Sequence, residues 1–254
     1  MGMSFSTIQI KNDQKSEPKQ FQKMFCEYLK KEDFIPTNDE DAELSYRLVF
    51  SDKSDWVTLC FAEDDPGSVR EDASKLAKML HTHCIATNVW DSDMIELHLF
   101  GALAEERDII VAGCTPWGKD EIPNIPSGGK GTRNQWEPLL VNDATWEQLK
   151  EIWNTDYTFA EEALSKMAPL LGIDSNNIMM DYRICEEEPP NNTNIVTLHF
   201  KSARTIPLFL KEGPAILQLE TAGRPIRWRK FQFQVLQYWR YWDWGLCFLH
   251  RRLH

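Results

Sequence analysis

The chain has 254 residues, of which 42% are hydrophobic and 26% are charged, a balance typical of a globular protein. Its formal net charge of −11 argues against nucleic-acid binding by the body of the protein, because an acidic surface repels phosphates. No apolar run approaches the roughly 20 residues that a membrane helix needs, and the N-terminus lacks the pattern of a secretory signal, so we expect a cytoplasmic protein outside the membrane.

Residues 1–113 alternate between strand and helix patterns. Apolar and polar residues alternate as in strands over 4–10, 44–50, 56–62, 84–90, 94–100 and 108–112. Helical spacing predicts helices over 19–31 and 68–81, the second with a capping box from Ser68 to Glu71. The first six elements have the order of a split-βαβ, or ferredoxin-like, sheet, and we predict an α+β domain here. That fold hosts many unrelated functions, so it indicates no activity.

Residues 114–135 predict a long loop, because three prolines and four glycines disfavour regular structure. Residues 136–181 then predict a pair of helices. The first begins with a capping box from Thr145 to Gln148, and the second with one from Thr158 to Glu161. Two apolar stripes follow, made of Trp146, Leu149, Ile152 and Trp153, and of Phe159, Ala163, Leu164, Met167, Leu170 and Leu171.

Two residues indicate how the second helix of the pair ends. Pro169 falls inside the apolar stripe, so it should weaken or kink the last turn. Gly172 follows that turn and suits the left-handed position that closes a helix. Both stripes favour burial against the neighbouring sheet, with a partner-binding helical face as the alternative.

The rest of the chain predicts a smaller β region and a tail of different composition. A linker or exposed loop over 174–194 precedes a β region over 195–222, with strands over 195–201, 207–210 and 215–220. Residues 223–254 hold seven basic side chains against one acid, and four of the ten tryptophans. Aromatic and arginine side chains together favour a single-stranded nucleic acid or a membrane surface. Trp and Arg codons are rich in G, so we also hypothesise that this tail is a glycine-rich stretch read out of frame.

Several stretches carry a resemblance to a known family. They are LSYRLVFSD from residue 44, WVTLCF from residue 56, and WEPLL, TWEQLKEIWN, YTFAEEAL and APLLGID within residues 136–174. Here the chain resembles a family of uncharacterised bacterial proteins over roughly residues 1–222. In that family a glycine-rich strand region follows, and its replacement by the Trp/Arg-rich tail favours the out-of-frame hypothesis. The family has no assigned activity, so the resemblance implies no site.

Four patterns contain residue types that could support catalysis or ligand binding. Residues 127–132, SGGKGT, lack the order of a phosphate loop, which favours a loop tip over weak anion binding by Lys130. His81, His83 and Cys84 lack the second ligand pair of structural zinc. His81, His83, His98 and His199 are possible bases for a Cys114 nucleophile, but no local signature of a Cys–His hydrolase supports any of these pairings. Asp91 and Asp93 could form a carboxylate site with the acids of residues 63–65, but acidic clusters at turns are usually solvated surface. We therefore predict no cofactor and no metal, and assign no catalytic residue.

The six cysteines, Cys26, Cys60, Cys84, Cys114, Cys185 and Cys247, are widely spaced, with no C-x-x-C pair. This spacing favours buried free thiols in a reducing cytoplasm.

The leading functional prediction is a non-catalytic, acidic protein-binding module, with an immunity- or inhibitor-like role. Its contact surface is expected on the acidic body or on loop 114–135, where Trp117, Lys130 and Trp136 are the predicted contacts. The alternative is a small-molecule enzyme or ligand-binding protein with a site between the sheet and that loop. The sequence leaves the oligomeric state open.

Overall fold

The computed structural model describes residues 2–62, 66–103, 105–113, 131–155, 157–187, 189 and 193–203, and the backbone of residues 218–221 and 224–227. By its internal contacts the chain divides into two compact units, residues 1–204 and residues 205–254. The candidate site lies in the first unit.

The described residues of the first unit form eight strands and six α-helices. The strands are β1 (Phe5–Lys11), β2 (Phe34–Pro36), β3 (Leu44–Ser51), β4 (Trp56–Phe61), β5 (Cys84–Trp90), β6 (Met94–Phe100), β7 (Glu106–Gly113) and β8 (Thr193–Ser202). The α-helices are α1 (Pro18–Lys31), α2 (Pro66–Leu80), α3 (Arg133–Trp136), α4 (Trp146–Asn154), α5 (Glu161–Leu170) and α6 (Ile184–Glu187). Two short 3-10 helices, η1 (Asp39–Asp41) and η2 (Glu137–Leu139), complete the set.

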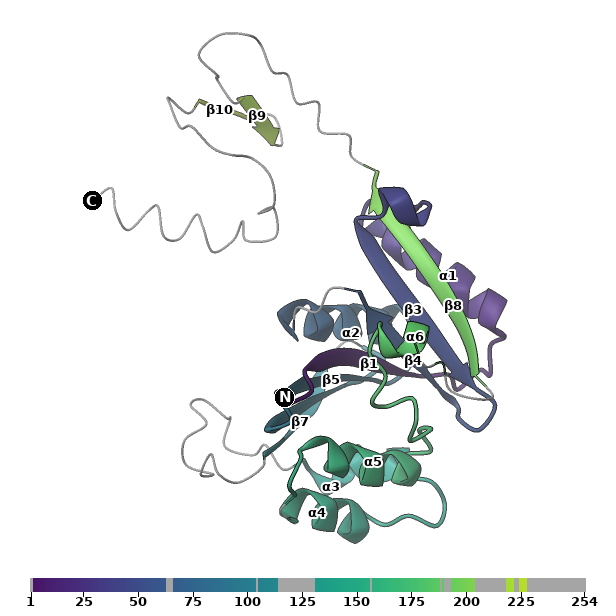
Figure 1. Cartoon of the computed structure of the whole chain (residues 1–254), viewed down its shortest axis with the longest axis vertical. Coiled ribbons are helices and arrows are strands. Elements are labelled where there is room, and N and C mark those ends of the chain that lie inside the picture. The colour runs from purple at the N-terminus through teal and green to yellow at the C-terminus, as the bar shows by residue number, and fades with distance from the viewer. Residues whose placement is uncertain are drawn as a thin grey trace, which may run out of the picture. The chain divides into compact units, whose positions relative to one another are not determined.

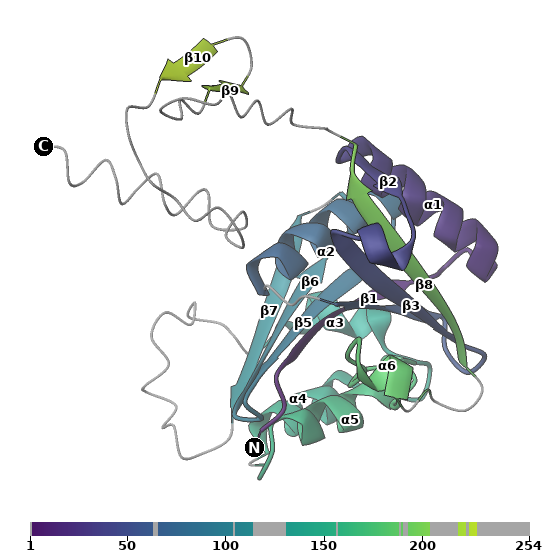
Figure 2. The same ribbon diagram turned by 45° about the horizontal axis from the view of Figure 1, so that its top comes forward.

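The strands form one sheet in the order β2-β8-β3-β4-β1-β5-β6-β7, and every neighbouring pair is antiparallel. Helices α1 and α2 cover one face, and α3, α4 and α5 lie on the other (Figures 1 and 2). The α+β class predicted from the sequence is therefore confirmed. All six strands predicted within the first 113 residues are also present, each shifted by at most two residues at either end.

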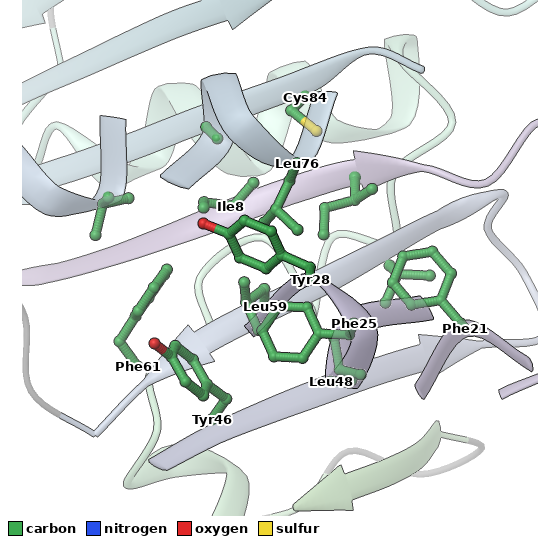
Figure 3. Packing of buried hydrophobic residues seen from close by; sticks show 14 of the residues in the cluster. Ile8, Phe21, Phe25, Tyr28, Tyr46, Leu48, Leu59, Phe61, Leu76 and Cys84 are labelled. Atoms are coloured by element: carbon green, nitrogen blue, oxygen red, sulfur yellow. The ribbon is translucent and has the colours of Figure 1, made fainter. Parts of the chain in front are cut away.

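The α1–α2 face holds one hydrophobic core. On β1, Ile8 and Ile10 point into it, because side chains two residues apart lie on the same face of a strand. Phe25 of α1 packs edge-on against Tyr46 of β3, with ring centroids 5.3 Å apart (Figure 3). Leu76 of α2 is fully buried in the same cluster. Both helices are thus held to the sheet by the apolar stripes that predicted them.

The opposite face carries what we call the helical layer, α3, α4 and α5 with η2. Trp136, Leu149 and Leu164 from this layer are fully buried with Leu97 of β6. Trp56 on β4 ties the layer to the sheet, because its indole N–H donates to the backbone carbonyl of Leu171 at 2.8 Å. The predicted burial of the helical pair against the sheet is confirmed.

Two local predictions about the helical pair are also confirmed. The Thr145 hydroxyl accepts from the Gln148 amide at 3.3 Å, while the Gln148 side chain accepts from the Thr145 amide at 2.8 Å. Gly172 has φ +69°, the left-handed conformation expected after the last turn of α5.

Two predicted helix starts are wrong. Helix α2 begins at Pro66, so Ser68 lies inside its first turn, because proline is pre-set for the first helical position. Helix α5 begins at Glu161 after Ala160, which makes no side-chain cap. The Phe159 amide instead donates to the Glu162 carboxylate at 3.2 Å, and Phe159 is 53% exposed.

The C-terminal strands differ from the predicted small β region. Strand β8 overlaps the predicted strand 195–201 but joins the main sheet between β2 and β3, pairing along the whole of β3. In the second unit β9 (Gln218–Thr221) pairs with β10 (Arg224–Arg227) as an antiparallel hairpin. The predicted strand 207–210 lies outside the described residues, as does the tail after residue 227.

Candidate functional site

An open groove of about 250 Å³ runs across the helical layer. It is lined by Gln148, Glu151 and Ile152 of α4, by Thr155 and Tyr157 of the segment that follows α4, and by Lys166 and Leu170 of α5. Helices α4 and α5 bury Leu149, Leu164 and Met167 in the core, whereas Ile152 and Leu170 stay partly exposed and line the groove.

Three of the seven side chains that line the groove are aliphatic or aromatic. Ile152, Tyr157 and Leu170 are only partly buried, and each packs against the core of the helical layer. Val141 extends the apolar surface beside Leu170, since its amide donates to the Leu170 carbonyl at 2.9 Å and its side chain is 41% exposed. Phe159, at 53% exposure, adds a second exposed apolar group to the helical layer.

The rim of the groove is charged. Lys166 lies over the Tyr157 ring, with its Nζ atom 4.5 Å from the ring centroid, so this lysine is held at one wall. Glu151 is exposed at the other wall. Residues 145–170 contain five acids and two lysines, so the groove lies in a negative local field.

The size of the groove limits what it holds. Pockets for small-molecule ligands usually measure roughly 300–1,000 Å³ and enclose most of the ligand. This groove is smaller and open along its length. It would therefore enclose little of such a ligand.

Trp136, one of the three predicted partner contacts, lies in the core. Its side chain is fully buried, and its indole N–H donates to the Asp108 carboxylate of β7 at 3.0 Å. The Thr132 amide and hydroxyl donate to the same carboxylate oxygen. These three donors hold α3 against β7, so Trp136 has no surface available to a partner in this structure.

The other two predicted contacts, Trp117 and Lys130, lie outside the described residues, as do residues 114–130 as a whole. Gly131 is described, and its amide donates to the Ile109 carbonyl at 3.2 Å. Because Thr132 donates to a carboxylate, the end of the SGGKGT segment is engaged with an acid rather than open to a phosphate. A site under loop 114–135 remains a prediction.

The histidines considered for chemistry are differently engaged. His98 is 2% exposed and lies between two carboxylates, with Nδ1 2.6 Å from Glu106 and Nε2 3.2 Å from Glu96. The hydrogen bond from His98 is the main cause that lowers the pKa of Glu96. Both ring nitrogens are thus occupied, and neither is left for a metal or a substrate.

His81, His83 and Cys84 do not converge. His81 is exposed in the turn after α2, with φ +51°, whereas Cys84 is fully buried under α2, where burial raises the pKa of its thiol. Burial lowers the pKa of His83. Across the described part of the chain, no three His, Cys, Asp or Glu side chains gather where a metal ion would fit. The predicted base partners of Cys114 cannot be placed against it, because Cys114 lies outside the described residues.

Asp91 and Asp93 lie on either side of Ser92, in a turn that is hydrogen-bonded to the N-terminal segment and to α5. Between them, the Ser92 hydroxyl accepts from the Met3 amide at 2.7 Å and donates to Glu161 of α5 at 2.9 Å. The turn therefore fixes the N-terminus of α5. Residues 63–65, the other acidic cluster, lie outside the described residues.

A second cluster, which the sequence did not predict, surrounds two thiols. The Sγ atoms of Cys60 on β4 and Cys185 on α6 are 3.8 Å apart. Arg47 of β3 lies directly across from Cys60 in the sheet register. The guanidinium of Arg47 is 3.9 Å from the Tyr182 ring centroid and forms an ion pair of 3.1 Å with Glu186.

The electrostatics of this cluster lower the pKa of the Cys185 thiol. The hydrogen bond between Cys185 and Cys60 is the largest cause that lowers the pKa of the Cys185 thiol, and the positive charge of Arg47 lowers it further. Burial acts in the opposite direction but does not prevail. The two cysteines are 125 positions apart, so no local motif in the sequence points to the pair.

None of the helices in the described residues has the length and apolar character needed to cross a bilayer. Comparison with protein-family models, with curated proteins and with solved structures found no match.

Proposed function

We propose that this protein is a protein-binding module and that the groove of the helical layer is its contact site. The observation that carries the proposal is that the partly exposed side chains of Ile152, Tyr157 and Leu170 line the groove between α4 and α5. Its small, open volume suits one or two side chains of a partner better than an enclosed substrate or cofactor. A helix or an extended segment with one large apolar anchor fits such a surface.

The charge of the groove indicates the chemistry of the partner. The first 222 residues carry a net charge of −17, because the tail after residue 222 contributes +6 to the total of −11. Residues 145–170, which form the groove, follow the same trend with five acids and two lysines. A basic segment with an apolar anchor would be attracted by this field and then held by burial of the anchor. An immunity- or inhibitor-like role, in which an acidic protein covers a basic target, agrees with this chemistry.

The first experiment is capture from a lysate of the native host. Both the full chain and a chain ending at Ala222 serve as bait, and mass spectrometry identifies the proteins retained. We expect both baits to retain the same basic protein, because the groove lies within residues 1–204. Retention by the full chain alone would assign binding to the tail and contradict the proposal.

The decisive step compares two charge reversals with the captured partner. Glu151→Lys changes the groove rim, whereas Glu27→Lys changes an exposed residue of α1, on the opposite face of the sheet. Both variants alter the net charge equally. We expect the first to weaken binding by about tenfold or more and the second by less than about twofold, because a contact charge acts more strongly than a distant one. Equal effects would show that the groove is not the contact site.

We also propose a split-βαβ unit at the centre of the sheet. Four adjacent strands have the order β3-β4-β1-β5, α1 follows β1, and α2 follows β4. Both helices pack on the same face of these strands, which supports this arrangement. On this reading β6, β7, β2 and β8 extend the unit at its two edges.

A further inference from the structure

The contact between Cys60 and Cys185 joins two parts of the chain that are far apart in sequence. Cys60 is fully buried at the centre of the sheet, and Cys185 is 5% exposed. Cys60 also contacts the backbone of Met180, with its Sγ atom 3.5 Å from the carbonyl oxygen. The segment from Met180 to α6 is therefore held on β3 and β4 by a small cluster of its own.

The separation of the sulfurs is compatible with bond formation. A disulfide needs the two Sγ atoms about 2.05 Å apart, so the present separation of 3.8 Å requires them to approach by less than 2 Å. Cys60 lies on a rigid central strand, whereas Cys185 lies on a four-residue helix near the surface. Side-chain rotation at Cys185 and a small shift of α6 supply this approach.

Cys185 is the thiol that we expect to react first, because it is 5% exposed whereas Cys60 is fully buried, and because its surroundings lower its pKa. Arg47 is held beside the pair by the Tyr182 ring, by the Tyr182 carbonyl and by Glu186, so its positive charge stays close to the sulfurs. A nearby guanidinium stabilises a thiolate, which is the nucleophilic form of cysteine. Cys26 and Cys84 differ, since burial raises the pKa of both thiols.

We propose that Cys60 and Cys185 form a reversible disulfide when the protein meets a hydroperoxide. The Cys185 thiolate attacks one peroxide oxygen, the O–O bond breaks, and the leaving hydroxide takes up a proton to give water. The sulfur of Cys60 then attacks the Cys185 sulfenic acid, the S–O bond breaks, and a second water leaves. Two thiols and one hydrogen peroxide thus become one disulfide and two waters, and a dithiol reductant reverses the change.

The bond would lock the segment before β8 to the sheet. Residues 174–187 connect the helical layer to β8, and β8 pairs with β3 along its full length. A covalent link from Cys185 to β4 closes a loop of 125 residues, and such a link restricts the unfolded chain strongly. The oxidised protein should therefore unfold at a higher temperature than the reduced protein. This inference is independent of the groove.

The test uses the full chain, reduced and then treated with one equivalent of hydrogen peroxide. Remaining thiols are alkylated, and unreduced tryptic peptides are mapped by mass spectrometry. We expect the linked Cys60 and Cys185 peptides to dominate and to form about tenfold or more faster than oxidised Cys26 or Cys84 accumulates. In Cys60→Ser a dimedone adduct should appear on Cys185, whereas in Cys185→Ser no adduct should appear on Cys60.

Two outcomes would overturn the inference. One is that Cys60 and Cys185 stay alkylatable while Cys26 becomes oxidised, and the other is that disulfides between other cysteines dominate. Circular dichroism of Cys60→Ser, and of Cys60→Ala as a second variant, checks that the fold persists. The lock itself is tested by thermal unfolding: an oxidised protein that unfolds at the same temperature as the reduced one would refute it.

Discussion

Replacing Trp136 by alanine tests most directly how the helical layer is held to the sheet. The Trp136 side chain is fully buried, and an aromatic side chain of this class buries about 150–250 Å². At about 25 cal/mol per Å² this area corresponds to about 4–6 kcal/mol, which is an upper bound because the unfolded chain is partly compact. Measured Trp→Ala changes in cores are about 3–5 kcal/mol, and we expect a loss in that range.

The hydrogen bond can be separated from the packing. Trp136→Phe keeps an aromatic ring but removes the indole N–H that donates to Asp108. Asp108 keeps the two donors of Thr132, so its carboxylate is not left without partners. We expect Trp136→Phe to lower the free energy of unfolding by about 1–3 kcal/mol, less than the alanine change.

Urea unfolding followed by far-ultraviolet circular dichroism measures both changes. Phe159→Ala is the matched control, because Phe159 is a large apolar residue of the same region that is 53% exposed. It should change the free energy of unfolding by less than about 0.5 kcal/mol. A Trp136→Ala protein within about 1 kcal/mol of the parent would refute the core assignment. Such a protein with impaired partner capture would restore Trp136 as a contact residue.

Three further changes probe single features of the fold. Burial raises the pKa of Asp72 to about 6, while the hydrogen bond that Tyr28 donates at 3.0 Å lowers it. The folded pKa lies above the unfolded value, so the contribution of this carboxyl to stability is fully present below about pH 4 and is lost as the pH rises through about 6. Asp72→Asn should remove about 2–3 kcal/mol of this pH dependence, measured as the free energy of unfolding from pH 4 to 7. A parent protein with no more pH dependence than the variant would contradict this. Gly172→Ala places a Cβ at φ +69° and should cost about 1–2 kcal/mol in urea unfolding, so an unchanged midpoint would argue against the left-handed turn. Thr145→Ala should cost about 1 kcal/mol through loss of its cap, whereas Thr158→Ala should be nearly neutral; equal losses in thermal unfolding would contradict the assigned start of α5.

The groove was only partly accessible to prediction from the sequence. The stripe containing Ile152 predicted a helix with a buried face, and that face is present. The pattern did not show that Ile152 would lie at the edge of the buried face, next to Leu170 of another helix. Tyr157 stands in the turn between the helices, where no periodicity applies. The groove is lined by residues of two helices, so the periodicity of either helix alone does not predict it.

Trp136 illustrates the opposite error. In the sequence it follows a loop rich in proline and glycine, which suggested an exposed aromatic contact. Its burial depends on Asp108 of β7, which is 28 residues earlier and provides the acceptor for its indole. Composition near a residue says little about exposure when the partner that buries it lies on another element.

The sequence by itself determined the type and approximate limits of most elements in the first unit. Helix and strand periods, and the cap at Thr145, depend on residues within about four positions of each other, so they can be read locally. Only the tertiary structure decided which strands are neighbours, because sheet order depends on contacts between distant segments. It placed β8 beside β3 and brought Cys60 to Cys185 across 125 positions. Burial of apolar faces selects such contacts in three dimensions, and a one-dimensional pattern does not contain that information.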